Sequence, residues 1–588
     1  MRPTPTRRHP LAVALFLLIV AGNTMLTFRQ EAVPDAQANM LTEAFKSDDP
    51  SLYLNDDVFS MGGPGAPWQL RLPVYRRLVR WTVHRVGRGD PVNALRVIGA
   101  GCSLIYLVCM YVLLYRQTHS SAVAMLVAVM STAIFSVRRP YWGIGPIFAV
   151  TPAGMALCVV PLLVLLLANS LGRWRAVGVF FLTGVLGNVH LPSAVNLLAV
   201  LSIVVVATGR ARLRAWGMVL AGIAAAAIGS SGALVYYAVT ARAAAVTWNE
   251  MPLSEVRRTL QVAGVYVLYP AVMIHALRWL PMTALLAAPA AVLSLAGRYR
   301  FRELGFWLWF LAGALVVAFG AQGLSQLAGA LLGIRPPVVE FFEALRLARL
   351  ALYVLLAEAL VHLVRMTQTR RGWAHAAVTA VAVIYVGASL NVEPLRHMLR
   401  DAITRVARTA PGLAERERRE QQAELREIAT WAAGATPDEA LFVTDRAEVR
   451  MRGRRAISCC GADVRYFYHL APDRLGEWAQ RLRTQRKLLK PPQGVQADAD
   501  KIVAFVDALW RRREYVPSRT YVVISAEAAP APTRRLVAVS PPRQQWGRHW
   551  RVLRVLPFRP EMPAAMRGDL STTMPGRIAD TIEGPARP

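Results

Sequence analysis

The stretch DDPSLYLNDDVF, residues 48–59, carries four aspartates, although the 588-residue chain has a net charge of +31. It follows a basic N-terminus and an apolar run near residues 11–28 that is long enough to form a membrane helix. Asp-Pro and Asn-Asp pairs are also common turn formers. These carboxylates therefore either take part in chemistry or shape a turn in the first loop after a membrane helix.

Apolar runs recur along the first two thirds of the chain, and 54% of all residues are hydrophobic. A run of about 20 apolar residues crosses the hydrocarbon layer as a helix. The sequence predicts about eleven such spans; the runs lie near residues 11–28, 93–114, 121–137, 146–168, 175–189, 193–208, 214–238, 280–297, 304–331, 346–365 and 373–391. Residues 258–279 are predicted to form an interfacial helix instead.

The loops between these runs predict the orientation. With the N-terminus in the cytoplasm, the inner loops are 115–120, 172–175, 209–214, 297–302 and 365–372, and most of them are short and basic. An odd number of spans leaves the C-terminal region outside. We therefore expect a multi-pass protein of the bacterial inner membrane with a periplasmic or extracellular C-terminal domain. This topology accounts for the basic charge, and no nucleic-acid module is found.

The chain divides into a membrane part and a polar C-terminal part. Residues 1–391 form the predicted transmembrane domain, and its long first outer loop, 29–92, ends in an amphipathic helix. Residues 392–434 are predicted to be a charged helical linker and 559–588 a disordered tail. Between them, 435–558 alternates short β-branched runs with helices and predicts a small α/β domain. It has no nucleotide-binding motif.

The five cysteines do not form a metal motif. Cys102, Cys109 and Cys158 lie in apolar runs and are expected to be buried. Cys459 and Cys460 are adjacent in the polar domain. They are either two free thiols or a vicinal disulfide.

The order of the predicted segments and four short motifs carry a resemblance to a known family. The first-loop pattern D-P-x-L-[FY]-x-x-D matches DPSLYLND from Asp49 to Asp56. A later His-Pro step is matched, with one inserted residue, by His190-Leu191-Pro192, and the outer-domain patterns T-P-x-x-A-L-F and E-W-x-x-R match at residues 436–442 and 477–481. The order of a first helix, a long outer loop with acidic residues near its start, a bundle of spans and a soluble outer domain resembles the GT-C superfamily of integral membrane glycosyltransferases, and the motifs resemble an uncharacterised bacterial subgroup of it.

The resemblance implies transfer of a sugar from a polyprenyl-phosphate-linked donor on the outer face of the membrane. In this superfamily an acidic residue of the first outer loop is commonly the base, sometimes with a metal. Carried over, that role falls on Asp49 or Asp56, and Asp48 and Asp57 are the candidates for holding a divalent cation, Mg or Mn. The alternative is that these residues only form a turn.

Basic and aromatic residues gather in the predicted outer loops. Arg138, Arg139, Arg335 and Arg346 are candidates for binding the donor phosphate, or they anchor the helices at the interface. His190, at the outer end of a helix, either binds substrate or forms a packing hydrogen bond. The expected partners are the lipid-linked donor and membrane lipid, without nucleic acid, and protein partners are not predicted.

Two alternatives to a transferase stay open. The first is a membrane scaffold of the cell envelope that keeps the fold without catalysis. The second is a transporter, for which the intramembrane pair Glu358 and His362 is the main indication. The sequence does not name the sugar or the acceptor.

Overall fold

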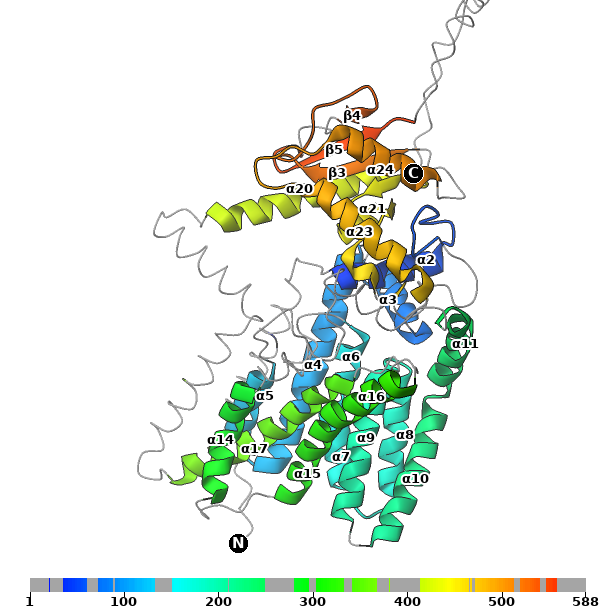
Figure 1. Cartoon of the computed structure of the whole chain (residues 1–588). Coiled ribbons are helices and arrows are strands. Elements are labelled where there is room, and N and C mark those ends of the chain that lie inside the picture. Colours follow the sequence, from blue (N-terminus) through cyan, green and yellow to red (C-terminus); the bar gives the residue numbers. More distant parts are fainter. Residues whose placement is uncertain are drawn as a thin grey trace, which may run out of the picture.

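A computed structural model describes residues 35–60, 72–87, 90–132, 151–209, 211–248, 280–295, 303–332, 341–366, 413–464, 466–467, 471–511, 519–539 and 546–557, and the single positions 21 and 380. Figure 1 shows a bundle of helices with a small α/β unit at one end. The structure is mostly helical with a small C-terminal sheet, as the sequence predicts.

The first loop contributes two helices between the bundle and the C-terminal unit. Helix α2 spans Asp35–Asp48, and α3 spans Pro73–Arg85. Helix α3 is amphipathic: Tyr75, Val79 and Val83 are buried, whereas Trp81 is 58% exposed. The predicted amphipathic helix in the second half of the loop is therefore present.

The bundle follows from the apolar runs, because a helix satisfies all of its backbone hydrogen bonds internally. Its helices are α4 (Pro91–Thr118), α5 (Ser121–Ser131), α6 (Pro152–Leu157), α7 (Val160–Ala168), α8 (Arg175–Gly187), α9 (Leu191–Thr208), α10 (Arg212–Gly229), α11 (Ser231–Trp248), α14 (Leu280–Leu295), α15 (Leu304–Leu315), α16 (Gln322–Leu332) and α17 (Leu345–Met366). The π-helix η3 (Val316–Ala321) joins α15 to α16, and the 3₁₀ turn η4 (Phe341–Ala344) precedes α17.

Five of the described helices are long and apolar enough to cross a membrane, at 91–118, 191–208, 212–229, 304–325 and 341–365. Shorter apolar helices lie at 121–131, 152–168, 175–187 and 286–295. Together these cover nine of the predicted runs. Apart from the single positions 21 and 380, the runs at 11–28 and 373–391 and the predicted interfacial helix at 258–279 lie outside the described residues, so the count of eleven stays a prediction.

Helices α8 and α10 approach each other closely because glycines face the contact. A Cβ on Gly184 would lie 2.1 Å from the backbone oxygen of Ala226, and one on Gly222 would lie 2.7 Å from the Phe180 ring. Small residues at such crossings let helix backbones approach in a membrane, where van der Waals packing drives association. Helix α17 lies in the interior, and 78% of the most apolar 18-residue stretch between residues 341 and 365 is buried.

The C-terminal unit is a five-stranded mixed sheet in the order β2-β1-β3-β5-β4. Its strands are β1 (Leu441–Val443), β2 (Ala456–Ile457), β3 (Thr520–Ser525), β4 (Leu536–Ala538) and β5 (Trp550–Val555). Strands β1, β2 and β3 run parallel, and β5 is antiparallel to both β3 and β4. Its helices are α20 (Leu413–Ala435), α21 (Ala447–Gly453), α23 (Leu475–Leu489) and α24 (Ala499–Arg511), with short turns η7 (Gly461–Asp463) and η8 (Pro472–Arg474).

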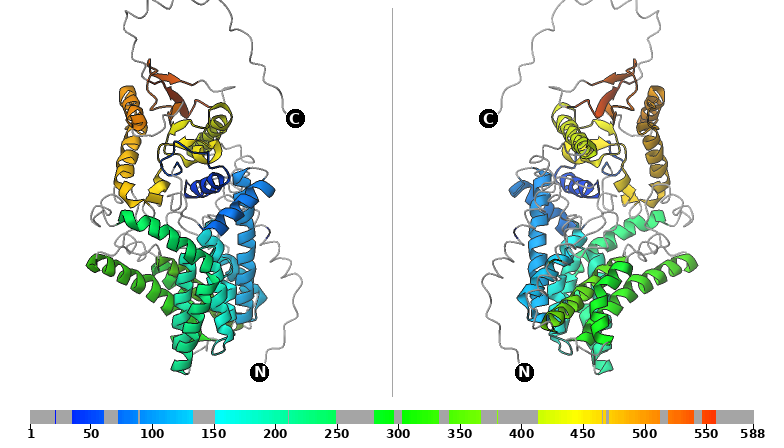
Figure 2. Two further views of the ribbon diagram at one scale, coloured as in Figure 1. Left: turned by 90° about the vertical axis from the view of Figure 1, so that its right-hand side faces the viewer. Right: turned by 90° about the vertical axis from the view of Figure 1, so that its left-hand side faces the viewer.

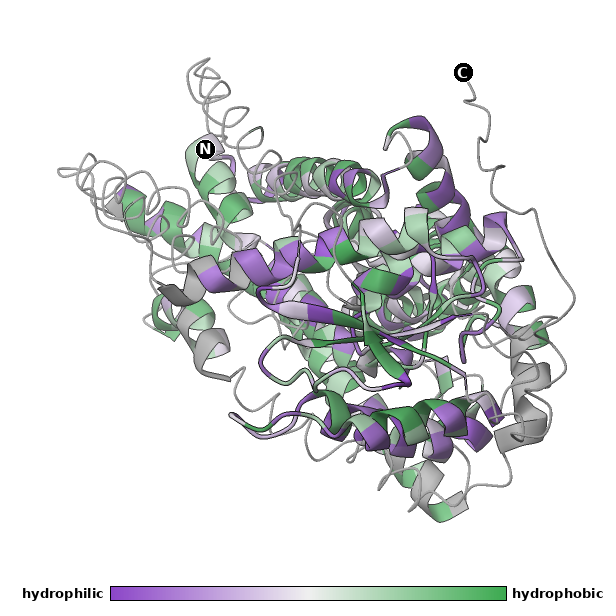
Figure 3. Ribbon diagram, turned by 90° about the horizontal axis from the view of Figure 1, so that it is seen from above, coloured by the Kyte–Doolittle hydropathy of each residue, from purple (hydrophilic) through white to green (hydrophobic). Residues whose placement is uncertain are grey.

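Hydrophobic burial explains how these helices cover the sheet. All three residues of β1 are buried, and in the view from above the strands are largely green while the helices around them also carry purple residues (Figure 3). Helix α20 falls in the stretch predicted as a linker, but its Leu425, Ile428 and Ala432 are buried in the core shared with Phe442. Helix α20 is therefore an integral part of the C-terminal unit.

The first loop and the C-terminal unit lie at the same end of the bundle. Helix α2 contacts α21 and η7, and both views of Figure 2 show α2 between the sheet and the bundle. In a membrane, the chain between residues 60 and 413 must then cross an even number of times. That both segments are on the outer side stays a prediction.

Candidate functional site

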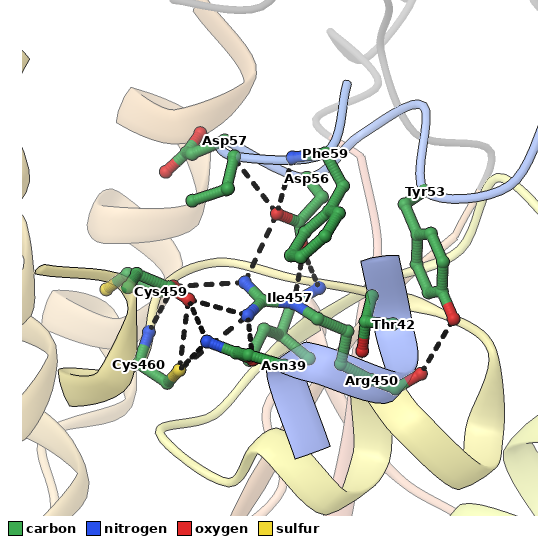
Figure 4. Close-up of polar contacts among 12 residues, drawn as sticks. Asn39, Thr42, Tyr53, Asp56, Asp57, Phe59, Arg450, Ile457, Cys459 and Cys460 are labelled. Carbon is green, nitrogen blue, oxygen red and sulfur yellow. Dashed lines mark hydrogen bonds and ion pairs between the residues drawn. The ribbon is translucent and has the colours of Figure 1, made fainter. Parts of the chain in front are cut away.

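Asp56, one of the two predicted bases, is buried in the contact between the first loop and the C-terminal unit (Figure 4). Its Oδ2 accepts hydrogen bonds from Arg450 Nε at 2.7 Å and from the Ile457 backbone N–H at 3.2 Å. Its Oδ1 accepts from Arg450 Nη2 and from the backbone N–H groups of Val58 and Phe59. Both carboxylate oxygens are therefore occupied by donors.

Arg450 lies between two carboxylates in this contact, which we call the loop–domain junction (Asn39, Asp56, Arg450 and Asp463). Its Nη1 donates to Asp463 Oδ1 at 2.7 Å and to Asn39 Oδ1 at 2.9 Å. Burial lowers the pKa of the Arg450 guanidinium, but Asp463 and Asp56 outweigh burial and raise it well above its ordinary value. The arginine is thus a permanent cation that holds the two segments together.

The other three aspartates of the opening stretch also have local partners. Asp48 forms ion pairs with Arg80 and His84 on α3, and Asp57 pairs with Arg481 on α23. Exposed Asp49 accepts hydrogen bonds from the Ser51 hydroxyl and N–H, which lower the pKa of its carboxyl. These contacts give Asp49 the geometry of a turn former.

The acidic loop does not fit a divalent cation. Asp48 and Asp57 each pair with an arginine, and they face different helices. In the described part of the chain, no group of three or more His, Cys, Asp or Glu side chains is arranged to hold a metal ion. A metal requirement stays a prediction that these residues do not support.

Cys459 and Cys460 are buried free thiols beside the loop–domain junction. The Cys460 thiol lies 3.2 Å from Asp463 Oδ1, and Cys459 Sγ lies 3.3 Å from Gln485 Oε1. Burial raises the pKa of the Cys459 thiol well above its ordinary value. Of the two alternatives, the structure thus has two thiols and no vicinal disulfide at Cys459 and Cys460, and the other three cysteines are buried as predicted.

A second polar cluster lies at the end of the bundle where α9 and α17 begin. His190 is the N-cap of α9, and its Nδ1 lies 2.8 Å from Ser193 Oγ. The Ser193 hydroxyl donates to Glu343 Oε2 at 3.1 Å, and His190 Nδ1 lies 3.9 Å from the same carboxylate oxygen. The predicted residue His190 is therefore linked to a carboxylate of η4, which the motif analysis did not assign a role.

Two arginines follow Glu343 on the first turns of α17. Arg346 is 7% exposed, and its Nε has no hydrogen-bond partner in the described part of the chain. Arg349 is 1% exposed, and neither of its terminal nitrogens has an acceptor among the described residues. Its guanidinium carbon lies 5.9 Å from the centre of the Tyr353 ring. Unpaired buried cations are costly, so this part of the bundle favours an anion.

An irregular helical segment borders the same cluster. The π-helix η3 contacts η4, where the Phe319 and Phe342 rings pack edge to face. Gln322 Oε1 accepts a hydrogen bond from the Phe341 backbone N–H. Short π-helical segments inside α-helices occur frequently at functional sites.

The remaining predicted residues either are not described or have partners elsewhere in the bundle. Arg138, Arg139 and Arg335 lie outside the described residues. Glu358, discussed for a transporter, is buried and accepts a hydrogen bond from Gln117, which ties α17 to the last turn of α4. No sequence pattern pointed to Arg349, because it lies in an apolar run that is typical of an ordinary membrane helix.

Among the comparisons with known proteins, the one with solved structures found matches. No family model and no curated protein matches the chain. Ten chains of solved structures match, among them the crystal structure of ArnT from Cupriavidus metallidurans in the apo state. That match covers 92% of this chain and 97% of that chain, with 13% sequence identity and a TM-score of 0.47. A likeness of this degree does not assign a function.

Proposed function

We infer that the protein is a membrane glycosyltransferase that takes a sugar from a polyprenyl-phosphate-linked donor, at the end of the bundle that carries the C-terminal unit. The observation that carries this proposal is the pair Arg346 and Arg349, of which Arg349 is buried with no acceptor for its two terminal nitrogens among the described residues. A lipid phosphate supplies the missing anion, and its chain lies against the apolar helices. The motif resemblance supplies the reaction class.

The charge of the site suits this reaction. Breaking the bond between the sugar and the phosphate places negative charge on the leaving oxygen. Two guanidinium groups held in a buried position stabilise that charge more strongly than exposed arginines, because water screens them less. We propose that Arg349 binds the phosphate and that Arg346 supports it one helical turn away.

Binding of polyprenyl phosphate to the purified protein in lipid nanodiscs tests the proposal. Native mass spectrometry should detect saturable binding to the wild type, and Arg349→Met should abolish it. The same variant should unfold at an equal or higher temperature, because methionine removes an unpaired buried charge. Arg175→Met, which removes an exposed arginine at the start of α8, should bind like the wild type. Equal binding by Arg349→Met and the wild type would contradict the proposal.

A further inference from the structure

Helix α3 of the first loop has a second apolar face besides the one that it buries in the core. On this face Val74, Leu78 and Trp81 are 48%, 36% and 58% exposed. Spacings of four and three residues place the three side chains in one row along the helix. Water is an unfavourable environment for such a row. A partner with an apolar surface is therefore expected to cover it.

The charged residues around this row are all basic. Helix α3, with the sequence PVYRRLVRWTVHR, has no acidic residue. Arg80 and His84 pair with Asp48 at the end of α2. Arg77 and Arg85 are exposed, and no acidic side chain among the described residues forms an ion pair with either of them. The partner of this face must therefore combine an apolar layer with negative charge.

The length of α4 shows where the membrane begins. Helix α4 has 28 residues, and its stretch 97–115, between Arg96 and Arg116, carries no charge. At 1.5 Å per residue this stretch is about 29 Å long, which matches a hydrocarbon core of about 30 Å. The first turns of α4, residues 91–96, therefore extend into the headgroup layer.

A short turn keeps α3 at the same depth as the start of α4. Only residues 86–90 separate the two helices. The Asp90 N–H donates to the Gly87 carbonyl at 2.9 Å, and a Cβ on Gly87 would lie 2.7 Å from the Asp90 backbone oxygen. Helix α3 also packs against α4, and Figure 1 shows it beside the upper end of that helix. Helix α3 thus lies at the level of the lipid headgroups.

We propose that this face of α3 binds the headgroup layer of anionic phospholipids, in the leaflet on the side of the C-terminal unit. The row of Val74, Leu78 and Trp81 enters the boundary between headgroups and acyl chains, where tryptophan is favoured. Arg77 and Arg85 donate hydrogen bonds to lipid phosphates. The inference does not depend on the proposed function, because it uses none of the residues of α17.

The bound lipid also has a consequence for the C-terminal unit. Helix α3 packs against α2, and α2 contacts α21 and η7 of that unit. The loop–domain junction ties the same segments together through Asp56 and Arg450. Lipid bound to α3 therefore holds the C-terminal unit at the membrane surface.

Spin labelling at position 78 tests where this face lies. The full chain with Leu78→Cys is labelled with a nitroxide in nanodiscs that contain phosphatidylglycerol, and the unsubstituted chain gives the background, because its five cysteines are buried. Collisions of the label with oxygen, which concentrates in lipid, should exceed those with a water-soluble nickel chelate. Val495→Cys, an apolar and 50% exposed position of the C-terminal unit, is the matched control and should show the opposite order.

Two results of this experiment would overturn the proposal. A label at position 78 that collides more often with the nickel chelate than with oxygen would place this face in water. A label that neither probe reaches would show that a protein, or a second copy of the chain, covers the face instead of lipid.

Energy transfer tests the preference for anionic lipid. A bimane attached to Leu78→Cys should transfer more energy to acyl-labelled phosphatidylglycerol than to phosphatidylcholine with the same label. Arg77→Gln and Arg85→Gln should each lower this preference by up to about 5-fold. Arg483→Gln, which removes an exposed arginine of α23, is the control and should leave the preference unchanged. Equal transfer to the two lipids would overturn the assignment of this face to anionic lipid.

Discussion

Replacing Asp56 by asparagine should open the loop–domain junction while the bundle stays folded. Asparagine has the size of aspartate, but one of its two terminal atoms is an NH₂ group. If that group takes the place of Oδ2, it meets the donors Arg450 Nε and Ile457 N–H. If it takes the place of Oδ1, it meets Arg450 Nη2 and the N–H groups of Val58 and Phe59. Either orientation loses at least two hydrogen bonds.

The size of the effect follows from the burial of the charges. Removing one partner of a buried ion pair costs about 3–5 kcal/mol, because the other charge is left without compensation. Asp463 still contacts Arg450 in the variant, so we expect a value near the lower end, about 3 kcal/mol. A local opening equilibrium that shifts by this amount changes about 100- to 200-fold. The change should be confined to the contact between α2 and α21.

The thiols of Cys459 and Cys460 report this opening directly. Both side chains are fully buried, and Cys460 contacts Asp463. Their alkylation by N-ethylmaleimide, followed by peptide mass spectrometry, measures the open fraction while closing is faster than labelling. Labelling of this peptide should accelerate about 100- to 200-fold in Asp56→Asn. The buried Cys102, Cys109 and Cys158 of the bundle serve as internal controls and should keep their rates.

Asp49→Asn is the matched variant for this experiment. It makes the same chemical change seven residues before Asp56, at an exposed position, and its effect should stay within about 0.5 kcal/mol. An unchanged labelling rate in Asp56→Asn would refute the assignment of Asp56 to the junction. If glycosyl transfer were lost at the same time, Asp56 would be the base after all.

Two further substitutions test the packing of the fold. Gly184→Ala places a methyl group 2.1 Å from the Ala226 oxygen and should destabilise the bundle by about 1–3 kcal/mol. The control Gly178→Ala, on the same helix, places its methyl group where no atom lies within 4 Å and should not destabilise the bundle. Thermal unfolding in detergent distinguishes the two variants, and equal transition temperatures would count against the close α8–α10 contact. Glu424 Oε2 accepts hydrogen bonds from three backbone N–H groups at the start of β5. Glu424→Ala should therefore lower the stability of the C-terminal unit by about 2 kcal/mol and speed hydrogen exchange of these N–H groups. Unchanged exchange would contradict the role of α20 in this unit.

Local patterns in the sequence determined the helices. A long apolar run has few alternatives to a helix in a membrane, because the helix pairs its own backbone groups. The predicted runs therefore coincide with described helices, from the span at 91–118 to the one at 341–365. His190 was singled out from sequence through the local step His190-Leu191-Pro192 at a helix start, and its role stays a prediction. The alternation of short strands and helices likewise predicted the C-terminal sheet.

Only the tertiary structure decided what the polar residues do. Asp56 and Arg450 are 394 positions apart, and no pattern near either residue predicts that the two side chains meet. The same holds for Ser193 and Glu343, which are 150 positions apart. Arg349 becomes notable only because the packed bundle buries it and no described residue accepts from its terminal nitrogens. Helix formation depends on neighbours along the chain, whereas the partner of a charge depends on which segments the fold brings together.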